Sequence, residues 1–134
     1  MNILQYLLEK YPNKRWDWLS ISDNTNITMK IIEKYPDKPW EWGMWGISQN
    51  PNLTMEFIEK YPNKPWKWGY IPMNPNITME FIEKNTDKIY FRWLSSNSFT
   101  LENKRLKKKE AYWLLEGTRA FNRIENLVIS STYM

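Results

Sequence analysis

Apolar and polar side chains alternate with a helical period in short stretches of this chain. In "TMEFIEKY" (residues 54–61), Met55, Phe57 and Ile58 fall on one half of a helical wheel, and the glutamates and the lysine fall on the other. The stretch ends at Pro62, and a proline pushes the preceding residue out of the α region. The pattern predicts a helix of about eight residues, which needs neighbouring elements to be stable in water.

A helix-start signal precedes each of these stretches. In "NPNITMEFIEK" (residues 74–84), Thr78 is a good N-cap because its hydroxyl would accept a hydrogen bond from a first-turn N–H. Ile77 before it and Ile82 after it are spaced as a hydrophobic staple. The same arrangement recurs at Ile27/Thr28/Ile32 and at Leu53/Thr54/Ile58.

The segment that follows each stretch predicts a second short helix. In "NKPWKWGYIPMN" (residues 63–74), Asn63 would cap that helix, and Pro65 would lie in its first turn, where a missing N–H costs little. Asp37 and Pro39 are the equivalent pair one repeat earlier. Each copy of the pattern is therefore predicted to form two short antiparallel helices joined by a turn.

This helix-turn-helix pattern occurs four times, over residues 1–24, 25–50, 51–74 and 75–97. The longer second repeat contains the extra pair Trp45–Gly46. A repeat length of 24–26 residues is typical of repeat proteins in which each unit packs on the next. We therefore predict an all-α fold, a short-helix α-solenoid. A leucine-rich-repeat-like strand solenoid has a similar period, but no repeat shows its alternating L-x-L strand core.

The C-terminal part departs from the repeat. "TLENKRLKKKEAYWLLEG" (residues 100–117) predicts a longer helix that ends at Gly117, and residues 118–131 predict another. Because a repeat array needs atypical ends to cover its core, residues 98–134 are expected to be capping helices of the same domain as residues 1–97.

The composition removes several kinds of chemistry. The 134 residues include no Cys and no His, which excludes disulfides, Cys/His zinc sites, thiol nucleophiles and imidazole acid–base catalysis. Glu33, Glu59 and Glu83 recur one repeat apart on polar helix faces, whereas an acid–base pair needs two different environments about 5–10 Å apart. We predict that the chain is not an enzyme and uses no cofactor or metal.

The sequence also bears on the compartment. No apolar run approaches the roughly 18 residues of a membrane span. The first residues, "MNILQYLLEK", lack the basic and apolar regions of a secretory signal. We expect an intracellular protein that is neither secreted nor bound to a membrane.

The chain contains nine tryptophans, and six of them form two aligned rows. The first row is Trp16, Trp40 and Trp66, and the second row is Trp18, Trp42 and Trp68. An exposed row could stack bases, grip prolines or hold a cation. Burial between repeats is the favoured interpretation, because each repeat contacts the units on both sides. The residue between the rows is Asp17, Glu41 or Lys67, so we expect that position to be solvated. The second row is kept as a candidate interaction site.

The net charge of +4 is concentrated near the C-terminus. Residues 1–94 have a balance of +1 and residues 95–134 a balance of +3, mostly from "KRLKKK". Such a cluster could contact phosphates in a salt-sensitive way, but a solvated face of a capping helix is the favoured interpretation. The candidate residues are Lys104, Arg105, Lys107, Lys108 and Lys109.

The repeat itself resembles tandem repeats in uncharacterised proteins of giant nucleocytoplasmic DNA viruses, of the mimivirus and marseillevirus kind. "NPNLTMEFIEKYPNKPWKWG" (residues 50–69) has the N-P-N-I-T start, with Leu for Ile, and the P-x-K-P-W-x-W element of that family. The resemblance covers residues 1–97. The fourth copy, "KNTDKIYFRW", loses both prolines and has Tyr90 in place of the first tryptophan. The resemblance implies a viral origin and a repeat scaffold, and it brings no catalytic or binding residues.

These observations favour a non-enzymatic repeat scaffold for protein–protein interaction. A virion or minor capsid component is one concrete form, located in the virion or in the cytoplasm of an infected host. The alternatives are a nucleic-acid-binding module that uses the basic C-terminal helix and a host-factor adaptor. Because Met1 falls inside a repeat, self-association through the N-terminal repeat is also expected.

Overall fold

The computed structural model describes the backbone of residues 2–132 and the side chains of residues 2–119, 122 and 126. Over this described part the chain is helical and contains no strand, so the prediction of an all-α chain is confirmed. The chain divides into two compact units, Met1–Leu101 and Glu102–Met134.

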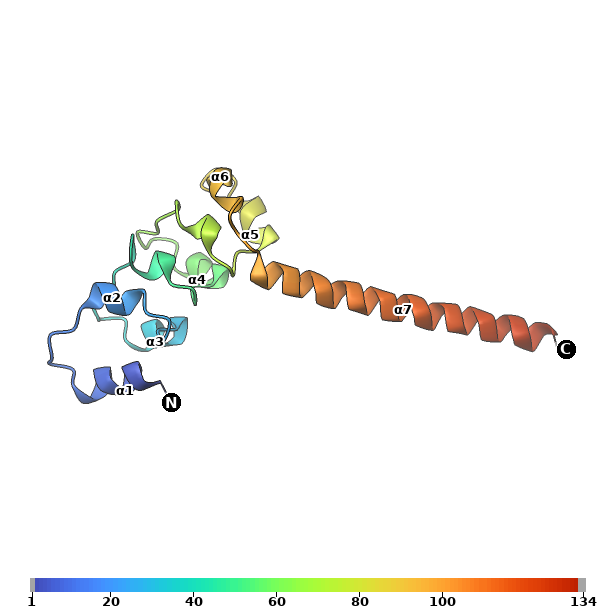
Figure 1. Ribbon diagram of the computed structural model, residues 1–134, viewed down its shortest axis with the longest axis horizontal. Coiled ribbons are helices and arrows are strands. Elements are labelled where there is room, and N and C mark those ends of the chain that lie inside the picture. Colours follow the sequence, from blue (N-terminus) through green and yellow to red (C-terminus); the bar gives the residue numbers. More distant parts are fainter. Residues whose placement is uncertain (1, 133–134) are drawn as a thin grey trace. The chain divides into compact units, whose positions relative to one another are not determined.

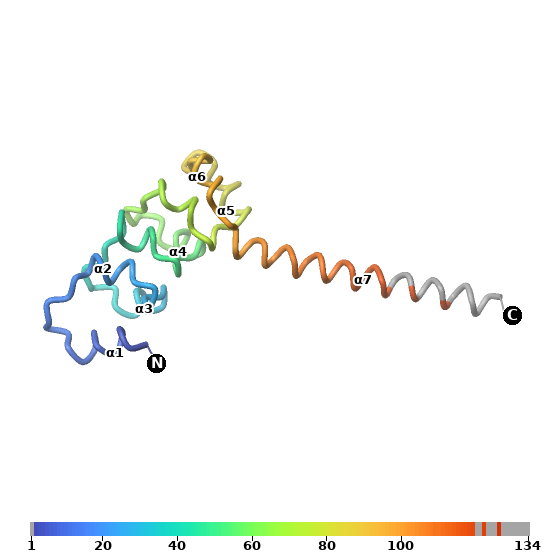
Figure 2. Tube along the Cα trace, in the orientation of Figure 1, coloured from blue at the N-terminus to red at the C-terminus, as the bar shows by residue number. Residues whose placement is uncertain are grey.

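The first half of each repeat forms one short helix. These helices are α1 (Ile3–Lys10), α3 (Met29–Lys34), α4 (Met55–Lys60) and α5 (Met79–Lys84). Figure 1 shows them following one another through the first compact unit, and Figure 2 traces the same path along the Cα atoms. The last three are six residues long, slightly shorter than expected.

The predicted N-caps are confirmed. The Oγ1 atoms of Thr28, Thr54 and Thr78 accept hydrogen bonds from backbone N–H groups three residues on, at 3.4, 3.2 and 3.2 Å. The residues spaced as hydrophobic staples are all buried in one apolar cluster: Ile27, Ile32, Leu53, Ile58, Ile77 and Ile82. Each helix therefore begins where the sequence placed it.

The second half of the repeat differs from the expectation. The N–H of Lys64 donates to the Tyr61 carbonyl at 3.3 Å, and the N–H of Trp66 donates to the Lys64 carbonyl at 2.7 Å. These bonds form two consecutive tight turns with Pro62 in the first and Pro65 in the second. The prediction that Asn63 and Asp37 cap a second helix, with Pro65 and Pro39 inside it, is wrong.

The helical turns that do occur lie further along the chain. They are α2 (Trp18–Ser22), the 3-10 turns η1 (Ile47–Gln49) and η2 (Ile71–Met73), and α6 (Phe91–Leu94). Helix α2 begins at Asp17, whose Oδ1 accepts hydrogen bonds from the N–H groups of Leu19 and Ser20 at 3.1 and 3.3 Å. The second and third repeats have Glu41 and Lys67 in this place, which are poorer N-caps, and their second halves contain a single 3-10 turn.

The extra pair in the second repeat forms a special loop. Trp45 has a φ of 62°, in the left-handed region. A Cβ atom on Gly46 would lie 2.2 Å from the carbonyl oxygen of Glu41, so only glycine fits there. The insertion therefore leaves Trp45 exposed at the surface of the repeat.

Buried and half-buried polar side chains join consecutive repeats. Asn50 Nδ2 donates to the Ser22 carbonyl at 2.8 Å, and Asn52 Nδ2 donates to the Ile27 carbonyl at 2.9 Å. Asn76 and Asn97 donate in the same way to Leu53 and Asn74, at 3.0 and 2.9 Å. The hydroxyls of Ser22 and Ser48 accept hydrogen bonds from the N–H groups of Glu41 and Lys67, both at 2.9 Å. The same bonds thus recur one repeat apart.

The C-terminal segment forms one continuous helix, α7 (Thr100–Thr132). The prediction that a helix ends at Gly117 is wrong, because Gly117 does not have a positive φ. A glycine inside a helix costs only about 1 kcal/mol, which many neighbouring helix formers offset. The capping role expected for residues 98–134 stays a prediction.

Candidate interaction surfaces

The first tryptophan row has a structural role inside its own repeat. The indole N–H groups of Trp16, Trp40 and Trp66 donate to the carbonyls of Tyr11, Tyr35 and Tyr61, at 2.9, 2.8 and 2.8 Å. Each of these tyrosines is the C-cap of the helix before it. The indole therefore supplies a partner near the helix end, where carbonyls lack intrahelical donors. Trp40 and Trp66 are buried, as the sequence predicts for this row, and Trp16 is half-buried.

The second tryptophan row lies between repeats. The ring of Trp18 meets Trp40 edge to face at 5.1 Å, and Trp42 meets Trp66 at 5.3 Å. Trp42 also stacks on Phe57 at 6.2 Å, with an interplanar angle of 9°. All three rings of the row are half-buried against the core. The structure thus brings the predicted residues Trp18, Trp42 and Trp68 into repeat junctions, and their role in binding a partner stays a prediction.

The position between the two rows is exposed, as expected. Asp17, Glu41 and Lys67 all lie at the surface. Hydrogen bonds from the side chain and the backbone N–H of Ser20 lower the pKa of Asp17. The Asp17 carboxylate therefore serves as the N-cap of α2.

Glutamates at the end of the first helix make contacts across the junctions. The carboxylate of Glu9 accepts hydrogen bonds from the Tyr35 hydroxyl and from Lys34 Nζ, the latter at 3.1 Å. One repeat later, Glu33 accepts from Lys60 Nζ at 2.5 Å and from the Tyr61 hydroxyl at 3.0 Å. Sequence analysis separated Glu33 from catalysis, but it did not single out Glu9 and missed the partners of both glutamates, which lie one repeat on.

These contacts change the acidity of both carboxyl groups. The Tyr35 hydroxyl, followed by Gln5 and Lys34, lowers the pKa of Glu9 to about 2. The Lys60 ammonium, followed by Tyr61, lowers the pKa of Glu33. Both groups are therefore anionic at neutral pH.

A small pocket lies beside the second tryptophan row at two junctions. The pocket beside Trp18, which we call the Trp18 pocket, has a volume of about 260 Å³ and is bordered by Pro12, Tyr35 and Lys38. The equivalent pocket beside Trp42 has a volume of about 80 Å³, and Phe57 forms part of its wall. The helix position of Phe57 is occupied by Ile31 at the first junction. The smaller side chain accounts for the larger pocket.

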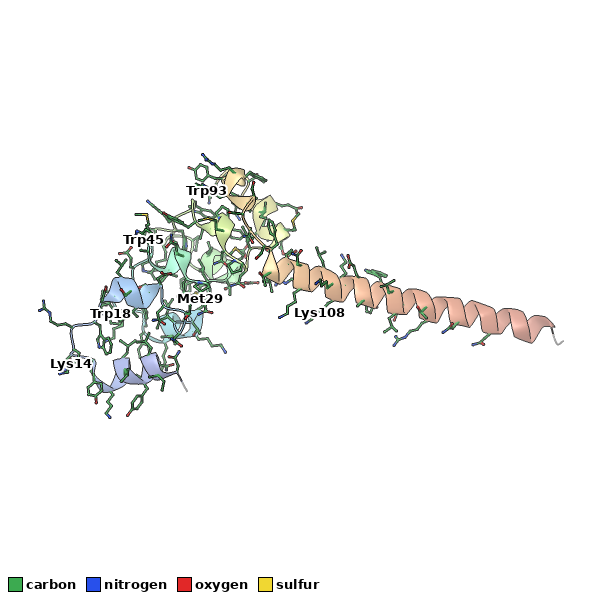
Figure 3. All side chains as sticks on the ribbon, in the orientation of Figure 1. Lys14, Trp18, Met29, Trp45, Trp93 and Lys108 are labelled. Atoms are coloured by element: carbon green, nitrogen blue, oxygen red, sulfur yellow. The ribbon has the colours of Figure 1, made fainter. Side chains whose placement is uncertain are left out.

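A second surface gathers aromatic and methionine side chains, and we call it the aromatic patch. Its members are Met44, Trp45, Tyr70, Met73, Tyr90 and Trp93, which are all exposed except the half-buried Tyr70. The Tyr70 hydroxyl contacts Met44 Sδ at 3.0 Å. Tyr70, Met73, Tyr90 and Trp93 line one concavity of about 470 Å³. Figure 3 shows Trp45 and Trp93 at the same margin of the first compact unit.

Sequence analysis missed the aromatic patch. Two signals pointed toward it: the Trp45–Gly46 insertion, and the fourth repeat, where the pattern of prolines and tryptophans breaks down. Trp45 is 57% exposed in its left-handed loop. These departures from the repeat place large apolar side chains in water.

The basic residues of α7 form a separate feature of the second compact unit. All five candidates, Lys104, Arg105, Lys107, Lys108 and Lys109, are exposed. Arg105 lies 3.7 Å from Glu102 in an i,i+3 ion pair. Tyr112 and Trp113 follow one turn later and are exposed as well. Figure 3 labels Lys108 on this helix.

In the described part of the chain, no group of three or more Asp or Glu side chains is placed to share a metal ion. Among the described helices, none combines the length and the apolar character needed to cross a bilayer.

The chain was also compared with known proteins. Comparisons with protein-family models, with curated proteins and with solved structures each found no match.

Proposed function

We propose that this chain is a non-enzymatic scaffold, an α-solenoid of short helices, that binds other proteins. The aromatic patch is the observation that carries the proposal. Clustered exposed apolar side chains mark interaction surfaces, and aromatic residues and Met are enriched in protein–protein interfaces. The patch is made by residues of the loops and short helical turns of three repeats, and hydrogen bonds join these repeats to one another.

Recurring junction contacts support the solenoid part of the proposal. The amides of Asn52, Asn76 and Asn97 each donate to carbonyls of the preceding repeat. In repeat arrays each unit contacts its neighbours and presents a continuous surface made from equivalent loops. Side chains that break the repeat pattern on such a surface are then free to serve recognition.

The viral setting rests on the resemblance of residues 1–97 to repeats of giant DNA viruses. A virion or minor capsid component and a host-factor adaptor are two forms of the same scaffold role. Recovery of the protein from purified virions would favour the first form, and recovery from infected-cell lysate alone would favour the second.

Affinity purification of the full chain from infected cells, followed by quantitative mass spectrometry, tests the interaction role. The double variant Trp45→Ser/Trp93→Ser is expected to lose the proteins that the wild type enriches. Trp113→Ser is the matched control, because it removes an equally exposed tryptophan from α7. Identical partner sets for the wild type and the double variant would contradict the proposal.

A nucleic-acid-binding module is the second candidate. Five exposed basic side chains within two turns of α7, followed by exposed Tyr112, favour it. A single strand bound through these residues would lose affinity with salt, with a slope of about −0.7 for each phosphate contacted. Absence of binding to single-stranded DNA or RNA at low salt would remove this candidate.

Self-association through the first repeat completes the proposed interactions. Helix α1 exposes Ile3 and Tyr6, which would lie in such a contact. A monomer by light scattering at high protein concentration would count against it.

A further inference from the structure

The two pockets beside the second tryptophan row are equivalent positions of one repeat. Five residues that line the Trp18 pocket, Glu9, Pro12, Trp18, Tyr35 and Lys38, have counterparts one repeat later around the pocket beside Trp42. The chain therefore contains two versions of the same site. One version is filled by the chain itself, and the other is open.

The occupant of the filled version is an aromatic ring. Phe57 stacks on Trp42 with ring centroids 6.2 Å apart, and at the next junction Phe81 stacks on Trp68 at 5.9 Å. At the first junction Ile31 occupies the position of Phe57, and the pocket beside Trp18 measures about 260 Å³ instead of about 80 Å³. A dry apolar cavity of about 150 Å³ already holds a benzene-sized ring. The Trp18 pocket is therefore large enough for one aromatic side chain, and its counterpart is not.

The charged groups at the rim of the Trp18 pocket differ in whether they already have a partner within the chain. The carboxylate of Glu9 is already engaged by Tyr35 and Lys34. Lys64 at the second junction lies over the ring of Trp42, 4.6 Å from its centroid. Its counterpart Lys38 borders the Trp18 pocket, is exposed, and forms no ion pair within the described residues. A ligand in this pocket would therefore meet one cationic group that has no carboxylate partner.

We propose that the Trp18 pocket binds an aromatic side chain of a partner protein, and that a carboxylate next to that side chain pairs with Lys38. The ring stacks on Trp18 as Phe57 stacks on Trp42, and it is bordered by Pro12 and Tyr35. The inference rests on the proposed protein-binding function and names the chemistry of the partner. The partner segment is an aromatic residue beside an acidic one.

The test uses small probes on the full chain, followed by NMR of the indole N–H groups, with Trp18 assigned from a Trp18→Phe variant. N-acetyl-phenylalanine carries the ring and the carboxylate, its amide carries the ring alone, and N-acetyl-leucine carries the carboxylate alone. The Trp18 resonance is expected to shift saturably with N-acetyl-phenylalanine. N-acetyl-leucine is expected to bind at least about tenfold more weakly, because it lacks the ring that stacks on the indole.

The matched variant is Ile31→Phe, which installs the side chain that the other junctions already have. It is expected to fill the pocket and weaken the probe at least about tenfold, with the fold monitored by circular dichroism. Phe57→Ile makes the opposite change and is expected to add a second site, which would be seen as a shift of the Trp42 resonance. Lys38→Gln, a surface change, is expected to weaken the acid probe and leave its amide unaffected.

Several outcomes would overturn the inference. They are an unchanged Trp18 resonance at the solubility limit of the probe, equal binding of the phenylalanine and leucine probes, or undiminished binding by folded Ile31→Phe. If Ile31→Phe does not fold, Phe57→Ile and Lys38→Gln still decide the question. Partner capture that depends on Trp45 and Trp93 but is unchanged in folded Ile31→Phe would leave the proposed function standing and overturn this inference alone.

Discussion

Trp66 and Trp68 stand two positions apart, yet their indole rings meet different neighbours. The N–H of Trp66 donates to Tyr61 in the same repeat, whereas the ring of Trp68 stacks on Phe81 of the next repeat. Pro62 ends the helix, and the indole of Trp66 then binds the carbonyl of the C-cap residue. At the residue scale, one tryptophan closes a repeat and the other joins it to its successor.

Replacing Trp66 separates these roles. Trp66→Phe retains an aromatic ring and removes the N–H donor, so we expect a loss of about 1 kcal/mol in the free energy of unfolding. Trp66→Ala also leaves a cavity, and we expect a loss of about 3–5 kcal/mol. Urea unfolding measures both, and Trp45→Phe at an exposed position is the control, with a change within about 0.5 kcal/mol. Equal effects of Trp66→Phe and Trp45→Phe would refute the role of the hydrogen bond.

The pKa of Glu9 predicts how stability depends on pH. The folded value is about 2 and the ordinary value is 4.5, so between these the folded state binds fewer protons than the unfolded state. The contacts of the ionised Glu9 therefore stabilise the folded state above pH 4.5, and this stabilisation is lost as the pH falls toward 2. We expect the Tm of the wild type to fall over this range and that of Glu9→Gln to fall less. Because the pKa of Glu33 is also lowered, the Tm of Glu9→Gln should still fall as the pH falls. The double variant Glu9→Gln/Glu33→Gln should reduce this fall further. Parallel Tm curves for the wild type and the double variant would contradict the assignment.

At the element scale, local signals predicted the first helix of each repeat well. Thr54 and Pro62 mark its two ends through short-range chemistry, so its limits can be derived from a few neighbouring residues. The second half was not predictable in the same way. The consecutive turns around Pro65 resemble a helix start in sequence, and some of the hydrogen bonds that hold the segment come from another repeat. Ser48, for example, accepts from Lys67, 19 positions away.

The polar bonds between repeats give the sharpest prediction at this scale. Asn50 is fully buried, and its Nδ2 donates to carbonyls of Ser22 and Asn24 at 2.8 and 3.2 Å. Asn50→Asp keeps the shape but places an acceptor against these carbonyls, so we expect a loss of about 3 kcal/mol or more. Asn63→Asp is the matched control, because the second repeat already has Asp37 in that exposed turn. Thermal unfolding of the two variants decides the point, and similar Tm values would contradict the buried role of Asn50.

The candidate site was only partly visible in the sequence. The second tryptophan row was visible from its spacing, and its role in binding stays a prediction. The space beside Trp18 lies at the junction where Ile31 replaces phenylalanine, and Ile31 looked like an ordinary core residue. The aromatic patch brings together Met44, Tyr70 and Trp93 from three repeats. Such a surface forms when segments far apart in the sequence pack together, so local sequence patterns do not reveal it.

At the scale of the whole molecule, the buried apolar side chains of the described residues all lie between Ile21 and Ile89. A chain of residues 1–101 keeps all of them, and we expect it to unfold cooperatively with a Tm within about 5 °C of the full chain. A chain of residues 1–96 also loses Asn97, whose amide donates to Pro72 and Asn74, so its Tm should be clearly lower. Calorimetry of the two chains provides the comparison. Loss of the cooperative transition in residues 1–101 would contradict a self-sufficient first compact unit.

The hydrogen bonds between repeats join residues that are close in sequence, from 19 positions apart for Ser48 and Lys67 to 28 for Ser22 and Asn50. During synthesis at about 5–20 residues per second, one further repeat leaves the ribosome in roughly 1–5 seconds. Short helices and turns form in microseconds, so each repeat would dock long before the next is complete. The last folded repeat of the nascent chain would then always present an apolar surface of the same size to the next repeat. Only one repeat at a time would expose apolar side chains that could aggregate.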